Sequence, residues 1–163
     1  MRFYMFLSAN IGLVEVAGLI ADSSGNLYGT TLVGGSYSGG VVFKLSPSGT
    51  ETVLYSFCSL PSCSDGANPF AGLIADRAGN LNGTTNFGGT AGCGGCGVVS
   101  KLSPSGTETV LYSFCSLPSC SDGAAPAAGL IADSSGNLYG TTTYGGASGI
   151  GVVFKLSGTG FIP

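Results

Sequence analysis

The sequence contains no histidine and no tryptophan, and charged residues make up only 8% of its 163 residues. The absence of histidine removes the most common general base and a frequent metal ligand. The absence of tryptophan removes the largest aromatic platform on which a sugar ring could stack. Five basic residues and a net charge of −3 provide no patch able to neutralise several phosphates. We therefore expect no nucleic-acid partner, no cofactor and no metal site.

Long apolar runs are also missing. The chain has no stretch of eighteen apolar residues, so we expect no membrane span. Residues 3–14 are apolar and follow Arg2, as in a signal peptide, but Glu15 interrupts and no small-x-small cleavage pattern follows. The same region has a second interpretation, because residues 3–8 align with residues 54–59 and could form a strand ahead of the first repeat.

What the sequence does contain is one block in three copies. Residues 17–31 read AGLIADSSGNLYGTT, residues 128–142 are identical, and residues 71–85 read AGLIADRAGNLNGTT. A second block, KLSPSGTETVLYSFCSLPSCSDGA, covers residues 44–67 and recurs unchanged at 101–124. Self-similarity at a nearly constant spacing, as between these copies, is typical of propellers, solenoids and arrays. We interpret the chain as a single repeat domain with units 1–57, 58–114 and 115–163, and with AGLIAD motifs that begin at residues 17, 71 and 128.

Each unit divides into four short strands at recognisable turns. In the first unit, residues 22–25 and 46–49 fit type I turns, with Asp or Ser first and Gly last. Strands are expected between these turns, because β-branched and aromatic residues are abundant there and helix formers are sparse. The expected strands of this unit are 17–21, 26–31, 40–45 and 51–57. The predicted fold is therefore all-β and β-propeller-like, with three four-stranded antiparallel blades. A three-fold β-trefoil or β-prism is the alternative.

Two features make the predicted array irregular. In the second unit, Asn82 and Ser100 replace a tyrosine and a phenylalanine that the other two units share, so we expect this unit to pack less well. The third unit ends after its third strand, and three blades alone would leave sheet edges exposed. We therefore expect a homo-oligomer or a part of a longer propeller.

These motifs resemble a known family, the GloVer-type tandem repeat of bacterial surface and secreted proteins. Its pattern is GLIAD-x-x-GNLYGTT followed by GG, GVVFKL, SPSGTET and VLYSF, and the resemblance covers about residues 17–157. The resemblance implies a β-propeller-like protein that is extracellular or attached to the cell surface. It supplies no catalytic residues.

The longer loops of all units should emerge at one end of the sheets, which we call the loop rim. It comprises residues 32–39, 86–97 and 143–151 between the second and third strands, and residues 58–69 and 115–126 between units. Divergent loops on a rigid scaffold are typical of binding surfaces. The candidate ligand residues on the loop rim are Tyr37, Asp65, Asn68, Asn86, Phe87, Asp122 and Tyr144.

These residues lead to three hypotheses for function. The preferred one is a non-catalytic extracellular module that binds a glycan or a protein at the cell surface through the loop rim. The first alternative is a fragment of a glycan-cleaving enzyme, in which Asp65 and Asp122 would act as paired carboxylates. The second alternative is a purely structural repeat segment.

All six cysteines also fall on the loop rim. An even number at repeated spacings in an exported-looking chain favours disulfides, and the predicted pairs are Cys58–Cys63, Cys115–Cys120 and Cys93–Cys96. Other interpretations are a zinc site of four converging thiolates, a redox C-x2-C motif, or reduced thiols without a role.

Overall fold

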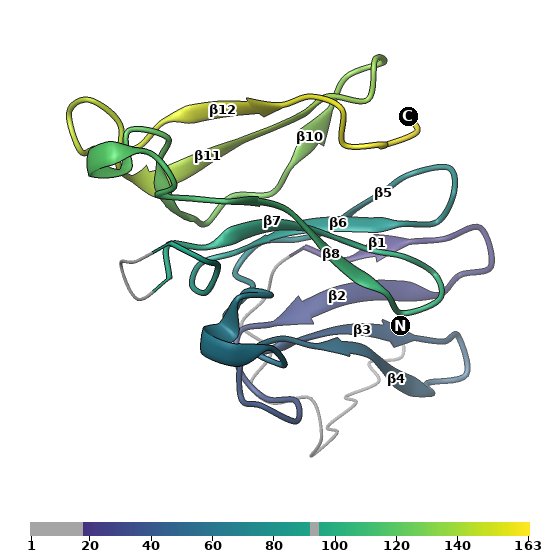
Figure 1. Ribbon diagram of the computed structural model, residues 1–163. Coiled ribbons are helices and arrows are strands. Elements are labelled where there is room, and N and C mark those ends of the chain that lie inside the picture. Colours follow the sequence, from purple (N-terminus) through teal and green to yellow (C-terminus); the bar gives the residue numbers. More distant parts are fainter. Residues whose placement is uncertain (1–17, 92–94) are drawn as a thin grey trace.

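The structure is a computed structural model that describes residues 18–91 and 95–163, and it is all-β (Figure 1). Three four-stranded antiparallel sheets follow one another along the chain, and we call them blades 1, 2 and 3. Blade 1 contains β1 (Ile20–Ala21), β2 (Leu27–Thr31), β3 (Val41–Leu45) and β4 (Glu51–Ser56). Blade 2 contains β5 (Ile74–Ala75), β6 (Leu81–Thr85), β7 (Val98–Leu102) and β8 (Glu108–Ser113). Blade 3 contains β9 (Ala124–Pro126), β10 (Ile131–Ala132), β11 (Leu138–Tyr144) and β12 (Val153–Leu156).

The tight hairpins form because the side chain of the first turn residue accepts hydrogen bonds from backbone N–H groups of the turn. The Oδ1 atom of Asp22 accepts hydrogen bonds from the backbone N–H groups of Ser24 and Asn26, both at 2.9 Å. Its Oδ2 atom accepts from the Asn26 amide at 2.7 Å and from the Tyr28 hydroxyl at 3.0 Å. Asp133 repeats this network in blade 3. These Asx turns join β1 to β2 and β10 to β11.

The expected fold class is confirmed, with small differences in the strands. The first strand of blade 1 begins at Ile20, three residues later than expected. Blade 3 differs more, because its fourth strand is β9, which lies in the loop between units and pairs with the far half of β11. The described residues form three separate open sheets, which does not favour the trefoil alternative.

Adjacent blades pack through equivalent residues. Leu73, Leu81 and Leu102 of blade 2 form one apolar cluster with Val42 and Phe57 of blade 1. A second cluster between the next two blades contains Val99, Phe114, Leu130 and Leu138. Each junction also has a hydrogen bond between blades, from the Thr30 hydroxyl to the Ala71 carbonyl and from the Thr84 hydroxyl to the Ala128 carbonyl. The repeat therefore reproduces the interface between blades together with the blades themselves.

The second unit does contain packing defects. Phe154 of blade 3 packs edge-on against Phe114, with ring centroids 5.0 Å apart, but blade 2 has Ser100 at the corresponding position. Ser100 and Phe57 line a small cavity of about 10 Å³ between blades 1 and 2, enough space for one water molecule. Asn82 is fully buried, and neither its amide nitrogen nor its amide oxygen has a hydrogen-bond partner.

The sequence also led to one prediction about membrane spans and one about residues 3–14. No helix within residues 18–91 and 95–163 is long and apolar enough to cross a membrane. The predicted strand or signal segment at residues 3–14 lies outside the described residues.

Candidate functional site

The loop rim exists as one end of the molecule. In Figure 1 the tight turns lie at the opposite end from the longer loops and the two short 3-10 helices, η1 (Pro61–Cys63) and η2 (Pro118–Cys120). Glycine is required where the loops return to the third strands. Gly40 and Gly97 both have φ of +88°, and a Cβ atom at either position would collide with the carbonyl of Thr31 or Thr85.

Two disulfides shape the loops between blades. The structure contains Cys58–Cys63 and Cys115–Cys120, the two pairs with four intervening residues that the sequence predicts. Cys96 is also disulfide-bonded, and its predicted partner, Cys93, lies outside the described residues. The sulfur atoms of Cys96, Cys115 and Cys120 lie within 4.8 Å of one another. Because these sulfurs are in disulfides, they are not thiolates available to a metal.

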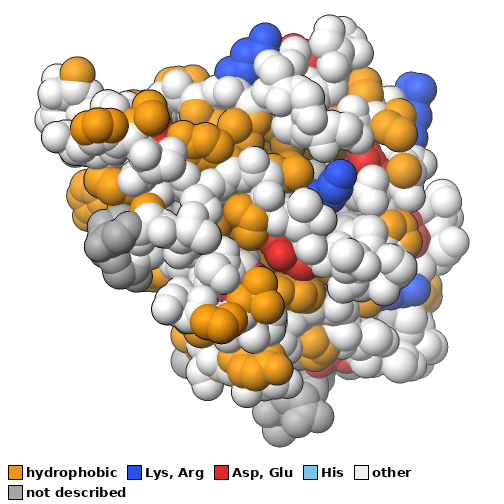
Figure 2. Space-filling view, viewed as in Figure 1, with side chains coloured by type: hydrophobic (Ala, Val, Ile, Leu, Met, Phe, Trp, Pro, Cys, Tyr) orange, Lys and Arg blue, Asp and Glu red, His pale blue; other side chains and the backbone are white. Residues whose placement is uncertain are grey.

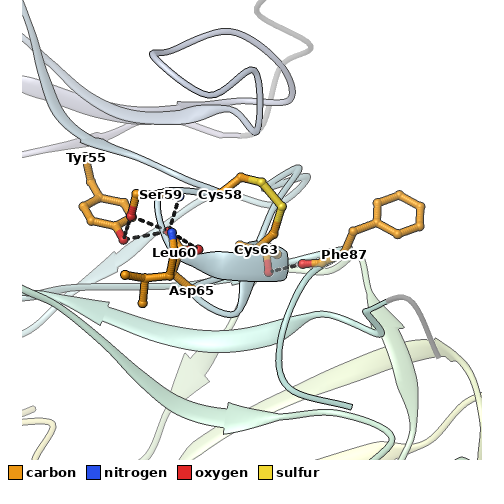
Figure 3. The surroundings of a disulfide bond; sticks show 8 residues. Tyr55, Cys58, Ser59, Leu60, Cys63, Asp65 and Phe87 are labelled. Atoms are coloured by element: carbon orange, nitrogen blue, oxygen red, sulfur yellow. Dashed lines mark hydrogen bonds between the residues drawn. A yellow bond between two sulfur atoms is a disulfide. The ribbon is translucent and has the colours of Figure 1, made fainter. Parts of the chain in front are cut away.

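Asp65 organises the first disulfide loop (Figure 3). Its side chain is fully buried, and its Oδ2 accepts hydrogen bonds from the Tyr55 hydroxyl and from the backbone N–H and hydroxyl of Ser59, each at 2.8 Å. Its Oδ1 accepts from the backbone N–H of Leu60 at 3.2 Å. Four donors from its own loop and strand therefore surround this carboxylate.

Asp122 repeats the arrangement in the second disulfide loop. It accepts hydrogen bonds from Tyr112, Ser116 and Leu117 at 2.8 to 3.2 Å. Burial acts to raise its pKa, but the hydrogen bonds from Tyr112 and Ser116 outweigh burial and hold the pKa below its usual value. Burial raises the pKa of the Tyr112 hydroxyl, and the nearby Asp122 charge raises it further. Both aspartates thus stabilise loops of the rim.

A groove on the loop rim brings three of the sequence-predicted residues together. It has a volume of about 260 Å³ and is lined by Leu32, Asn68, Phe70, Asn86, Phe87 and Ala127. Phe70 and Phe87 are 50% and 52% exposed, so about half of each aromatic side chain faces solvent. None of the six lining residues is charged.

Backbone hydrogen bonds position the groove. Asn68 has φ of +55° and donates from its side-chain amide to the Leu32 carbonyl at 2.8 Å. Its own carbonyl accepts a hydrogen bond of 3.0 Å from the Asn86 backbone, and Ala67 and Phe87 exchange two more. Asparagine tolerates this left-handed conformation better than most residues. The loop between blades 1 and 2 is therefore attached directly to the loop that presents Phe87.

The other sequence-predicted residues lie elsewhere. Tyr37 and Tyr144 are exposed but do not line this groove, and Asp65 and Asp122 are held in the disulfide loops. The candidate ligand residues inferred from the sequence did not include Leu32, Phe70 or Ala127. A comparison between repeats could have identified Phe70, since Ala127 occupies the equivalent position after the second disulfide loop.

A second unusual side chain lies between blades 1 and 2. Glu108, at the start of β8, lines the small cavity with Ser100, and its Oε1 atom is buried without a hydrogen-bond partner. Burial, with a smaller contribution from the Asp65 charge, raises the pKa of Glu108 to about 7. A pKa near neutrality suits an acid catalyst, but the cavity holds no more than a water molecule. The site therefore lacks space for a substrate.

Comparisons with known proteins agree with this architecture. A family model described as the Gloeobacter/Verrucomicrobia repeat matches residues 3–161. The chain is also similar to the solved structure of selenomethionine-substituted virginiamycin B lyase from Staphylococcus aureus, with a TM-score of 0.52 and 14% sequence identity. That match covers 86% of this chain and 41% of the lyase chain. The likeness shows the fold alone, which is of the propeller type. The search of curated proteins found no match.

Proposed function

Because the chain belongs to the Gloeobacter/Verrucomicrobia repeat family, we propose that it is a non-catalytic binding module whose loop rim carries the ligand. The observation that carries this proposal is the groove in which half-exposed Phe70 and Phe87 lie beside Asn68 and Asn86. Exposed aromatic side chains next to polar groups, on loops fixed by backbone hydrogen bonds, are typical of recognition surfaces.

The chemistry of the groove favours a neutral carbohydrate. The apolar face of a sugar ring can lie against an aromatic ring, and its hydroxyl groups can hydrogen-bond to side-chain amides. Because no charged residue lines the groove, it offers no charged partner to a phosphate or a carboxylate. We therefore assign a neutral glycan as the ligand class.

The glycan-cleaving alternative receives less support. Hydrolysis by two carboxylates needs one acid and one base on either side of an accessible bond. Asp65 is buried and its oxygens accept four hydrogen bonds from its own loop and strand, and Asp122 repeats this arrangement. Their hydrogen bonding favours a structural role for both.

An extracellular or cell-surface location is part of the proposal. Disulfides persist in oxidising compartments and are rare in the reducing cytosol. Two disulfides and no free cysteine among the described residues support export.

The experiment that tests the proposal is a screen of the purified chain against immobilised neutral and charged glycans, followed by calorimetric titration of any neutral oligosaccharide that binds. Phe87→Ala and Phe70→Ala should each weaken binding about 5- to 30-fold, because loss of one stacking ring costs roughly 1–2 kcal/mol. Tyr144→Ala is the matched control, since Tyr144 occupies the equivalent position of Phe87 in blade 3 and lies outside the groove. Binding that is lost equally in the control, or found only for charged glycans, would contradict the proposal.

A further inference from the structure

Three sulfur atoms from two loops lie together on the loop rim of blade 2, and we call them the sulfur cluster. They belong to Cys96, Cys115 and Cys120, and they lie within 4.8 Å of one another. Cys96 lies in the connection between β6 and β7, whereas Cys115 and Cys120 form the disulfide of the loop after β8. All three residues are partly exposed, so a small molecule in solution can reach them.

Backbone hydrogen bonds hold Cys96 against this disulfide loop. Its carbonyl accepts a 2.7 Å hydrogen bond from the backbone N–H of Ala125, which follows the loop. The next carbonyl, that of Gly97, accepts a 3.0 Å hydrogen bond from Phe114, which precedes the loop. The segment of Cys96 is therefore attached to the chain on both sides of the Cys115–Cys120 bridge.

Blade 1 has the same backbone arrangement without a cysteine in this position. Gly39 is the equivalent of Cys96, and Cys58 is the equivalent of Cys115. A Cβ atom at Gly39 would lie 2.7 Å from the Cβ atom of Cys58. Because the Cβ atoms of a disulfide are about 3.5–4.5 Å apart, a small outward shift of such a pair brings it to the separation that a disulfide spans. The repeat thus places Cys96 where it can bond to Cys115.

We propose that the sulfur cluster is a thiol–disulfide exchange site, at which the thiolate of Cys96 attacks the sulfur of Cys115. A dithiol from outside the chain first reduces the disulfide of Cys96. Two electrons pass to that bond, both of its sulfurs become thiols, and the dithiol becomes a disulfide. Cys96 then loses its proton to water, and its thiolate forms a bond to the Cys115 sulfur. The Cys115–Cys120 bond breaks, its electron pair stays on the Cys120 sulfur, and this thiolate takes up a proton from water.

Loop length favours the product of this exchange. The new bridge joins Cys96 to Cys115, 19 positions apart, whereas the bridge that is lost joins cysteines five positions apart. In the chain-entropy model, closing the longer loop removes more entropy from the unfolded chain and so stabilises the fold more. The exchange also ties the β6–β7 connection covalently to the loop after β8, and it releases Cys120. The rim therefore keeps a disulfide when the bridge of Cys96 is reduced.

The surroundings of the sulfur cluster decide which reductants suit it. Among the described residues, the basic side chains belong to the tight-turn end of the sheets: Lys44, Arg77, Lys101 and Lys155. Figure 2 shows the blue side chains away from the loop rim, which lies on the left in this view. No described basic side chain is therefore placed to attract an anionic thiol to the site. We assign a neutral dithiol as the class of reductant.

Trypsin makes the exchange visible, because cleavage after lysine and arginine separates the cysteines of the cluster. Peptide 78–101 contains Cys96, and peptide 102–155 contains Cys115 and Cys120. The exchanged bridge joins these two peptides, whereas the Cys115–Cys120 bridge lies within one of them. Peptide 45–77 contains the complete Cys58–Cys63 loop and reports any random reshuffling.

The test is a stepwise titration of the purified, oxidised 163-residue chain with dithiothreitol, at about pH 8 so that thiolates form. At the first step that releases free thiols, the thiols are trapped with N-ethylmaleimide at acid pH, and the digest is mapped by mass spectrometry without further reduction. We expect peptide 78–101 joined to peptide 102–155, with Cys96 bonded to Cys115 and with Cys120 alkylated. This product should be about 10-fold or more abundant than any linkage to peptide 45–77, because the reacting sulfurs are already close together.

Two variants serve as a test and a control. Cys96→Ser should abolish the joined peptides, because it removes the attacking sulfur. Replacing Cys58 and Cys63 together by serine should leave them unchanged, since that loop lies outside the cluster.

Four results would overturn the proposal. The first is release of free thiols without joined peptides, and the second is linkage to peptide 45–77 in equal amount. The third is joined peptides that persist in Cys96→Ser. The fourth is alkylation of Cys115 in place of Cys120, which would show that the other sulfur of the bridge is attacked.

Discussion

The hydroxyl of Tyr55 donates a 2.8 Å hydrogen bond to the buried carboxylate of Asp65, ten residues later in the chain. Tyr55 belongs to β4 and Asp65 to the disulfide loop that follows, so the bond attaches the loop rim to the sheet. The hydroxyl of Tyr112, in β8, donates a hydrogen bond of the same length to Asp122 in the loop that follows β8. The rim is thus held by buried polar contacts in addition to disulfides, and this makes the two aspartates the first targets for mutation.

We expect Asp65→Asn to destabilise the fold by about 2–4 kcal/mol, because hydrogen bonds to a charged acceptor contribute about 1.5–3 kcal/mol and an amide cannot accept at both positions. Asp122→Asn should act in the same direction with a smaller effect, since Asp122 is only half-buried. Urea unfolding measures both free energies. Unchanged stability in Asp65→Asn would contradict the structural role and return this residue to the list of catalytic candidates.

The pH dependence of Asp122 has a definite sign. Its pKa is lower in the folded than in the unfolded protein, so its ionised form contributes stability that is present above the unfolded pKa of about 4. This contribution is lost as the pH falls through the folded-state pKa. We therefore expect the Tm, measured by thermal unfolding between about pH 2 and pH 6, to fall less steeply toward acid pH in Asp122→Asn than in the parent chain.

Glu108 predicts a pH dependence of the opposite sign. Its pKa is raised to about 7 in the folded protein, so the protonated carboxyl is favoured and stability is greatest below the unfolded pKa of about 4.5. Stability should fall as the pH rises through about 7, which corresponds to a loss of about 2–4 °C in Tm by about pH 8. Glu108→Gln should remove this loss. Glu51→Gln, at the equivalent position of blade 1, is the control and should leave the loss in place.

The repeat explains why much of the fold could be predicted from the sequence. Turn residues such as Asp22 act through neighbours two to six positions away, so the hairpins could be inferred from local chemistry. Strand β9 was missed because its pairing with β11 joins residues that are distant in sequence, and alanines and a proline give no strand signal. The burial of Asp65 and the raised pKa of Glu108 were missed for the same reason, because both depend on the packing of one blade against the next.

Substitution of Asn82 should stabilise the second unit. Both polar atoms of its buried amide lack partners, and the cost of such a group is about 1–3 kcal/mol. Asn82→Leu keeps the number and branching of the side-chain heavy atoms, removes both polar atoms, and should raise the free energy of unfolding by about 1 kcal/mol. Asn80→Leu is the contrasting variant, because the Asn80 amide donates to Asp76 at 2.8 Å, and it should destabilise the protein. A loss of stability in Asn82→Leu would contradict this prediction.

The disulfides should stiffen the loop rim more than they stabilise the whole fold. Each of the two described bridges joins cysteines five positions apart, and closing so short a loop contributes roughly 2 kcal/mol. Replacing Cys58 and Cys63 together by serine should therefore lower the free energy of unfolding by that amount and leave the sheets intact by circular dichroism. Cys115→Ser with Cys120→Ser should have the same effect, because the two loops are identical in sequence from residue 58 to 67 and from 115 to 124.

Peptide mapping of the unreduced parent chain should also recover Cys93 joined to Cys96. A chain that releases free thiols on unfolding without reductant would contradict this pairing, and a collapse of the sheets in either double variant would contradict a role confined to the rim.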